Sequence, residues 1–307
     1  MPRLLDSEGY IANPRRKRPY LIPGLVPGTG RIQLCGGPRA GKSFLAYELA
    51  LAVAQGTEFL GFKVSRAGPV LYLQYDTPPD LWDDRLCLLK ESGVDISGPV
   101  YFVEEDDPEA IPRCNIMEVG DRAVLRRYIE EIKPVLVVVD VLRKVHNLKE
   151  NDSDSMKHVF DYLNAVTTGR ALLVLHHTIK SSTDPKAITR RPSEAGRGSS
   201  FVGGEVDANW LLSRDGRLDI EARFAKDDLH YILSRKANGF WNWRKPGFTA
   251  GRPAKEAYSK AEELNPALAD LSIREASARL GVPRETIRRA RKLHQIGFEV
   301  DDPVTEA

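Results

Sequence analysis

The sequence predicts an α/β fold with a parallel central sheet, antiparallel strands at one edge, and a small α-helical element at the C-terminus. Short apolar runs recur along the chain, at residues 32–35, 70–75, 135–139 and 171–175. Such Val-, Leu- and Ile-rich runs are typical of strands buried on both faces. Helix-length stretches separate them, at residues 44–54, 80–90, 120–132 and 155–167. Shorter runs separated by turns follow, at residues 208–212, 218–222 and 230–234, and indicate antiparallel edge strands.

Length, charge and cysteine content restrict the class of protein. The 307 residues suit one large domain and one small one. The chain has 45 Lys and Arg against 43 Asp and Glu, a net charge of only +2. A basic surface for nucleic acid would therefore have to be confined to part of the chain. Three cysteines without a Cys-x-x-Cys pair argue against a disulfide or zinc scaffold and favour a cytoplasmic setting. The basic run at residues 15–18 precedes no long apolar segment, so we expect neither a signal peptide nor a membrane partner.

Changes in composition divide the chain into five predicted segments. These are a basic, Pro- and Gly-rich arm (1–24), the α/β core (25–247), a linker (248–263), a helical element (264–296) and an acidic tail (297–307).

The strongest motif is a glycine-rich loop between the first apolar run and the first helix. It fits the pattern G-x-x-x-x-G-K-S, in which backbone N–H groups surround phosphate oxygens at a helix N-terminus. Lys42 then contacts the β- and γ-phosphates of ATP, and the Ser43 hydroxyl binds Mg²⁺. The predicted nucleotide-binding residues are Gly36, Gly37, Pro38, Arg39, Ala40, Gly41, Lys42, Ser43 and Phe44.

Two further strands are each followed by an acid. Asp140 ends the run at 135–139, beside the predicted loop strand, and we expect it to hold Mg²⁺ with Ser43. Asp76 follows the run at 70–75 and is the candidate for polarising the attacking water. Asp76 capping the next helix remains an open alternative.

A third strand ends in two histidines. His177 is a candidate contact to the γ-phosphate, and together with Asp76 and Lys42 it completes the predicted catalytic set. An ordinary strand-end histidine is an equal alternative, and His176 is the weaker candidate of the pair.

In this order the motifs resemble the RecA-like P-loop ATPases of the DnaB/RepA hexameric helicase type. The matching pieces are residues 36–43, 60–64, 70–79, 138–143, 175–178, 197–200 and 235–239, within about residues 21–242. The resemblance implies a RecA-like core that assembles into a homo-oligomeric ring, a hexamer. It further implies that ATP and Mg²⁺ bind between the subunits of this ring and that single-stranded DNA passes through its centre. It also implies a role in the replication of a plasmid or phage type of element.

Two positions depart from this family. Its catalytic base is usually Glu, whereas here the position is Asp76, which is one methylene shorter. The position at which the family carries the arginine that enters the neighbouring pocket falls near Asp207, and the later finger region keeps Arg235 and Lys236 but has Ala237. The remaining candidates for this trans finger are Arg197, Arg235 and Lys236.

Two basic segments are candidate DNA contacts. The loop at 180–200 carries five basic and two acidic residues, of which Lys180, Lys186, Arg190 and Arg191 are the candidates. Residues 272–292 have the spacing of a helix-turn-helix, with seven basic and two acidic residues. Its exposed candidates for contacts to duplex DNA are Arg284, Thr286, Arg288, Arg289 and Lys292. A solvated loop and a protein-docking helix pair are the alternatives.

The leading hypothesis is therefore an ATP hydrolase that acts as a DNA helicase or translocase. The rival is a regulatory or partition-type DNA-binding protein that uses ATP as an assembly switch, and a recombinase filament is a third possibility.

Overall fold

The computed structural model describes residues 4–12, 19–103, 114–178, 191–196, 201–225, 227–237 and 239–244. The chain divides into two compact units, Met1–Arg244 and Lys245–Ala307. All described residues belong to the first unit. The predicted linker, helix-turn-helix and acidic tail therefore lie outside the described residues.

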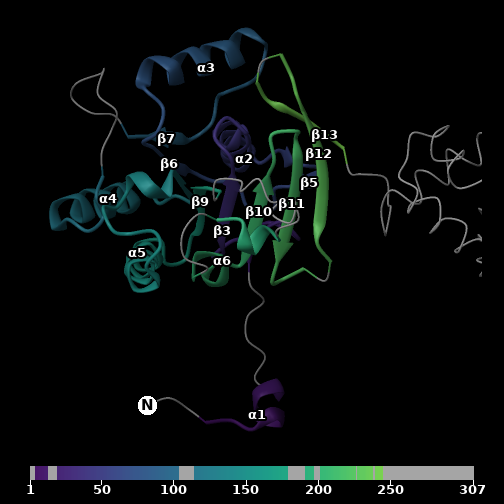
Figure 1. The fold of residues 1–307 in the computed structure, drawn as a ribbon. Helices are drawn as coiled ribbons and strands as arrows, with labels where there is room; N and C mark the ends of the chain where they lie inside the picture. Colours follow the sequence, from purple (N-terminus) through teal and green to yellow (C-terminus); the bar gives the residue numbers. More distant parts are fainter. Residues whose placement is uncertain are drawn as a thin grey trace, which may run out of the picture. The chain divides into compact units, whose positions relative to one another are not determined.

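A nine-stranded sheet runs through the described part of the first unit, in the order β13-β12-β11-β10-β3-β9-β8-β6-β7 (Figure 1). The strands are β3 (Arg31–Gly36), β6 (Val70–Gln74), β7 (Val100–Phe102), β8 (Leu136–Asp140), β9 (Ala171–His177), β10 (Ala208–Leu212), β11 (Arg217–Ala222), β12 (Leu229–Arg235) and β13 (Trp241–Arg244). Neighbours from β10 to β7 pair parallel, and β10 to β13 pair antiparallel. The predicted parallel sheet with antiparallel edge strands is confirmed.

The register refines that prediction at two places. Residues 208–212 were expected in an antiparallel hairpin, yet β10 also pairs parallel with β3, which makes it part of the parallel sheet. The expectation that Asp140 ends the strand next to β3 was wrong, because β9 lies between β3 and β8.

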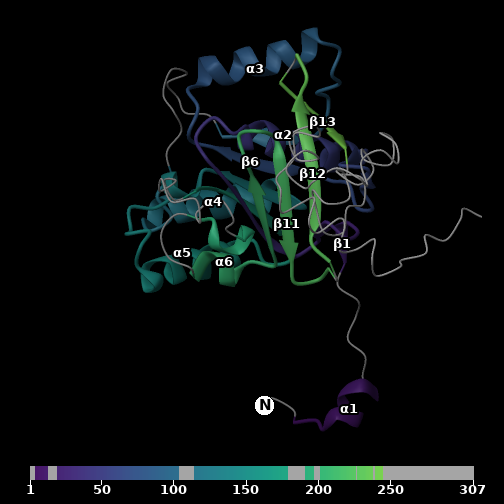
Figure 2. The ribbon, with the colours of Figure 1, turned by 45° about the vertical axis from the view of Figure 1, so that its right-hand side comes forward.

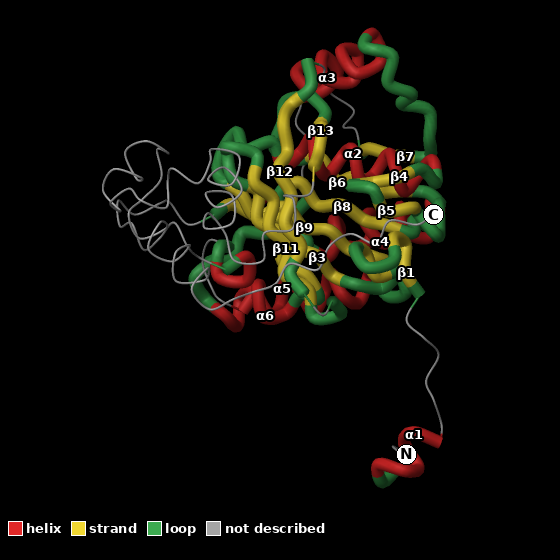
Figure 3. Tube along the Cα trace, turned by 90° about the vertical axis from the view of Figure 1, so that its right-hand side faces the viewer, coloured by secondary structure: helices red, strands yellow, loops and turns green. Residues whose placement is uncertain are grey.

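Helices cover both faces of the sheet (Figures 1 and 3). They are α2 (Lys42–Gln55), α3 (Pro79–Glu91), α4 (Val119–Ile132), α5 (Ser153–Val166) and the short α6 (Phe201–Glu205). One apolar cluster joins the sheet to α2 and α3, and a second joins it to α4, α5 and α6. Two small β-ribbons (β1 Tyr20–Ile22 with β2 Val26–Pro27, β4 Glu58–Phe59 with β5 Phe62–Lys63) and the 3₁₀ turns η1 (Leu142–Lys144) and η3 (Pro192–Glu194) complete the connections.

Strand residues alternate between these two clusters because successive side chains of a strand point to opposite faces. In β6, Val70 and Tyr72 pack on the α2 side, whereas Leu71 and Leu73 pack on the α4 side. A strand that needs apolar side chains on both faces has a continuous apolar sequence, which is why these runs were recognisable.

The N-terminal segment contains more structure than its composition indicates. Residues 7–12 form the short helix α1 (Ser7–Ala12), none of whose residues is buried. Strand β1 lies in the region expected to be the arm, and the side chains of Leu21 and Ile22 are fully buried in the core. The packed core therefore begins at about Tyr20.

The antiparallel hairpin of β12 and β13 lies near the start of α2 and one end of α3 (Figure 2). Since α2 begins directly after the glycine-rich loop, this hairpin borders the candidate site. Within the described ranges, no helix has both the length and the apolar character needed to cross a bilayer.

Candidate active site

The glycine-rich loop connects β3 to α2, as the motif predicts. Gly41 precedes the helix with a φ of 97°, a left-handed conformation that favours glycine. A Cβ on Gly36 would lie 2.7 Å from the carbonyl oxygen of Leu212, so the neighbouring strand also requires glycine there. The Lys42 ammonium folds back into the loop, where Nζ donates to the carbonyls of Gly36 (2.9 Å) and Gly37 (3.2 Å). The loop is thus closed around its own lysine.

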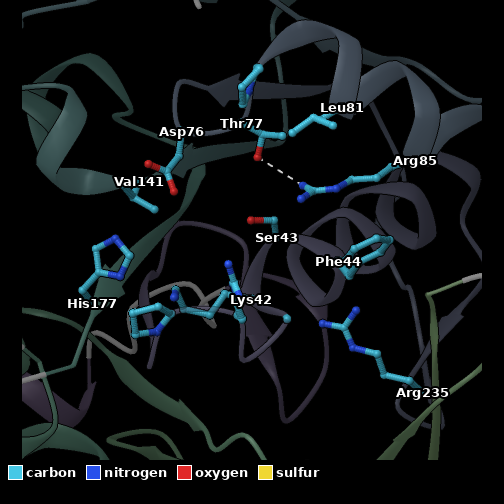
Figure 4. Close-up of a pocket in the computed structure, with 14 residues that line it drawn as sticks. Lys42, Ser43, Phe44, Asp76, Thr77, Leu81, Arg85, Val141, His177 and Arg235 are labelled. Atoms are coloured by element: carbon cyan, nitrogen blue, oxygen red, sulfur yellow. Dashed lines mark hydrogen bonds between the residues drawn. The ribbon is translucent and has the colours of Figure 1, made fainter. Parts of the chain in front are cut away.

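A pocket of about 590 Å³ opens beside this loop (Figure 4). Its lining comes from the loop, the start of α2, the segment after β6, α3 and the ends of β8, β9 and β12. The residues are Pro38, Arg39, Gly41, Lys42, Ser43, Phe44, Asp76, Thr77, Pro78, Leu81, Arg85, Val141, His177 and Arg235. The pocket therefore brings together most of the residues predicted from the loop motif and the strand ends, namely Pro38, Arg39, Gly41, Lys42, Ser43, Phe44, Asp76 and His177. The predicted Gly36, Gly37 and Ala40 belong to the same loop but are not part of the lining.

Asp140 lies beneath the pocket and is fully buried. Tyr72 donates from its hydroxyl to Asp140 Oδ2 at 2.9 Å, and a hydrogen bond from Ser43 also reaches the carboxyl group. Although β9 separates β8 from β3, Ser43 in the first turn of α2 is close enough to contact Asp140. The predicted pairing of Ser43 with Asp140 is thus present in the geometry.

Burial is the main electrostatic influence on Asp140. It raises the pKa of the Asp140 carboxyl from 3.8 to about 6, whereas the hydrogen bonds from Ser43 and Tyr72 lower it. Burial likewise lowers the pKa of Lys42, and the charge of Asp140 opposes that effect. Burial disfavours the charged form of each group alone, whereas the opposite charges of the ammonium and the carboxylate stabilise each other.

Asp76 is exposed to the pocket and does not cap the following helix. The Gln74 side chain accepts from the backbone N–H groups of Asp76 (2.9 Å) and Thr77 (2.8 Å) and donates to the Thr77 carbonyl (2.6 Å). Helix α3 begins after Pro78 without a side-chain cap. The helix-cap alternative is therefore wrong, and Gln74 holds the turn that directs Asp76 toward the pocket (Figure 4).

The two histidines at the end of β9 point to opposite faces. His177 lines the pocket, and burial, followed by the charge of Lys42, lowers its pKa. His176 is buried on the other face, with its Nδ1 4.0 Å from Glu150 Oε1. A mainly neutral His177 beside Lys42 is available to donate a hydrogen bond to a phosphate oxygen.

The structure adds residues that sequence patterns did not indicate. Tyr72 is one of several apolar strand residues, and only the pairing of β6 with β8 places its hydroxyl on Asp140. Arg85 lies two turns into α3 and donates to Thr77 Oγ1 at 3.1 Å. Arg214, in the turn after β10, donates to the Pro38 carbonyl at 3.2 Å. All three depend on contacts between distant segments, so no local motif could have identified them.

The candidate finger and DNA-contact residues are not gathered at this pocket, with one exception. Arg235 lines the pocket of its own chain, whereas Lys236 and Arg191 are exposed and do not line it. The other candidate DNA contacts and finger residues lie outside the described residues. They are Lys180, Lys186, Arg190, Arg197, Arg284, Thr286, Arg288, Arg289 and Lys292.

The oxygen donors fit a magnesium ion that is bound together with a nucleotide. Asp140 Oδ1 is buried without a hydrogen-bond partner, and the Ser43 hydroxyl is adjacent to the same carboxyl. In the part of the chain that the structure describes, no group of three or more His, Cys, Asp or Glu residues could hold a metal ion. Mg²⁺ commonly uses one or two protein oxygens and completes its shell with phosphates and water.

Comparisons with known proteins agree with this geometry. A sequence profile of the AAA domain family matches residues 2–183. The chain belongs to this AAA domain family. Its fold is similar to that of a solved ATPase domain, with a TM-score of 0.51 and 11% identity, over 70% of this chain and 84% of that one. A KaiC-like protein, PH0186 from Pyrococcus horikoshii OT3, matches with a TM-score of 0.44 and 12% identity, over 74% of this chain and 99% of that one.

The predicted RecA-like P-loop ATPase fold is thus confirmed. Family membership and the strand order agree on a nucleotide-binding ATPase core.

Proposed function

We propose that this AAA domain protein binds ATP with Mg²⁺ and hydrolyses it. The single observation that carries the proposal is the pocket, in which Lys42, Ser43, Asp76 and His177 meet above the buried Asp140. These residues come from four separate parts of the chain. A triphosphate is the ligand class that uses a glycine-rich loop, a buried lysine and oxygen donors together.

Each residue has a distinct task in this proposal. When a triphosphate enters, Lys42 exchanges its two carbonyl partners for phosphate oxygens and neutralises their charge. Ser43 and Asp140 hold Mg²⁺, which supplies further charge neutralisation at the phosphates. Asp76 orients and polarises the attacking water, and His177 donates to the γ-phosphate.

We further propose that hydrolysis is coupled to nucleic acid in a ring of several subunits, as a helicase or translocase of a plasmid or phage type of element. The membership in the AAA domain family and the fold shared with a solved ATPase domain support an ATPase core. A local contact supports the coupling, because Thr178, which lies between His177 and the basic loop, pairs with Gly196 in that loop. A change at the γ-phosphate can therefore reach the loop at Gly196.

Turnover measured with and without single-stranded DNA tests the proposal. We expect Mg²⁺-dependent release of phosphate that DNA accelerates, and a loss of about 10²- to 10³-fold in Lys42→Ala, because a developing charge loses its cation. Absence of turnover in the wild-type chain, or turnover unaffected by Lys42→Ala, would contradict it.

A second candidate function is an ATP-dependent assembly switch on a specific duplex site. Asp76 favours the assembly switch, because its side chain is one methylene shorter than the usual Glu and we expect it to polarise water less efficiently. Slow hydrolysis suits a switch better than a motor. Strand displacement on a forked duplex supports the motor. Sequence-specific duplex binding that requires ATP, without strand displacement, supports the switch.

A further inference from the structure

The candidate pocket has two chemically different ends (Figure 4). Asp76 and His177 lie at one end, and Phe44 and Arg235 lie at the other, with Lys42 between them. In a P-loop the lysine contacts the β- and γ-phosphates, while backbone N–H groups surround the α- and β-phosphates. Since the acid and the histidine are suited to the γ-phosphate, the end marked by Phe44 is the α-phosphate and nucleoside end.

Arg235 is packed against the glycine-rich loop of its own chain. The carbon of its guanidinium lies 5.0 Å from the centre of the Phe44 ring and 4.9 Å from that of Trp241. Its Nη2 fills the space where a Cβ on Gly41 would be, so the loop and the arginine fit each other closely. The hairpin that carries Arg235 is also attached to α2, because the Trp241 N–H donates to Glu48 Oε2 at 3.2 Å.

Two arginines lie beside Phe44, and within the described ranges no carboxylate pairs with either of them. Arg85 lies 5.3 Å from the centre of the same ring and donates to Thr77 Oγ1. Partial burial, followed by the charge of Arg85, lowers the pKa of Arg235. The two guanidinium groups lie beside one ring and their charges repel each other, and a phosphate matches their planar donors.

We infer that Arg235 binds the α-phosphate of the nucleotide held by its own chain, and does not act in the pocket of a neighbouring subunit. The inference rests on the proposed nucleotide function. A trans-acting arginine has to reach the γ-phosphate of the neighbour. Arg235 instead lies beside its own Gly41 and Phe44, and the two aromatic rings hold its guanidinium in place before the ligand arrives.

Binding measurements on the full chain separate these two roles. We expect Arg235→Ala to weaken the binding of ADP and of a non-hydrolysable ATP analogue by the same factor. This factor should be about 10- to 100-fold, the effect of losing one charge-assisted contact. Arg235→Lys keeps the charge and the packing of the stem, and we expect a smaller loss. Arg244→Ala, which removes an exposed arginine of the same hairpin, is the matched control and should bind within about twofold of the wild type.

The outcomes are distinguishable. Wild-type affinity for ADP in Arg235→Ala, with only ATP turnover reduced, would overturn the cis assignment and leave the proposed function intact. If the wild-type chain bound no nucleotide, or bound it no better than Lys42→Ala, the proposed function itself would be overturned.

A subunit-mixing experiment gives an independent readout. A mixture of Arg235→Ala and Lys42→Ala chains contains intact glycine-rich loops in one partner and intact Arg235 in the other. If Arg235 serves its own chain, turnover of the mixture equals the sum of the two separate variants. Recovery of turnover above that sum would show that Arg235 acts across an interface and would refute the inference.

Discussion

Replacing Asp140 by Asn should make the free protein more stable while abolishing Mg²⁺-dependent turnover. Burial raises the pKa of Asp140 from 3.8 to about 6, so the fold disfavours the ionised carboxylate that Mg²⁺ needs. An Asn at this position keeps an oxygen that accepts from the Tyr72 hydroxyl and carries no charge. Removal of the charge therefore removes a cost of folding.

The magnitude follows from the pKa difference. Two pKa units at about 1.4 kcal/mol each correspond to about 3 kcal/mol above pH 6, as an upper limit. Because the folded carboxyl binds its proton more tightly than the unfolded one, wild-type stability decreases as the pH rises from about 4 to about 6. The advantage of Asp140→Asn should therefore be about 3 kcal/mol at pH 7.5, about 1.5 at pH 5 and close to zero below pH 4.

Thermal unfolding at several pH values is the assay. For a unit of this size, about 1 kcal/mol shifts Tm by roughly 2–4 °C, so we expect Asp140→Asn to raise Tm by up to about 10 °C at pH 7.5. Asp84→Asn, which changes an exposed carboxyl on α3, is the matched control and should leave Tm nearly unchanged. A lower Tm for Asp140→Asn at pH 7.5, or a gain that does not shrink at pH 5, would refute the reasoning.

Three further predictions concern other parts of the site. Asp76→Asn should reduce kcat for steady-state phosphate release by about 10²-fold or more, whereas Asp76→Glu should retain or increase kcat. Equal activity in both variants would exclude a role of Asp76 in polarising water. Gly41→Ala should destabilise the unit by at least about 1 kcal/mol and weaken ADP binding, because φ is 97° and the new Cβ meets Arg235 and Trp241. Urea unfolding measures the change in stability, and a variant as stable as the wild type would contradict the close fit. Burial raises the pKa of Glu48 from 4.5 to about 7, so Glu48→Gln should gain up to about 3 kcal/mol at pH 8 and little at pH 4.5, as the midpoints of urea unfolding will show. An equal gain at both pH values would show that the charge of Glu48 is not its cause.

The order of motifs was predictable because each depends on a short stretch of chain. In the loop at 36–43, the glycines determine the backbone conformation, and Lys42 and Ser43 supply the groups that contact phosphate and metal. The strands were predictable for a related reason, since burial on both faces requires continuous apolar runs. Residues 7–12 and 20–22 were missed, because a short helix and a three-residue strand have too few residues for a periodic pattern.

What the sequence alone determined is therefore the RecA-like α/β class, the glycine-rich loop and the carboxylates that follow two of the strands. Only the tertiary structure decided that β9 separates Asp140 from the loop strand, that Tyr72 and Gln74 hold the two acids, and that Arg235 lies in the pocket of its own chain. The physical reason is that a motif is local, whereas strand order, register and the position of the β12–β13 hairpin depend on how distant segments pack together.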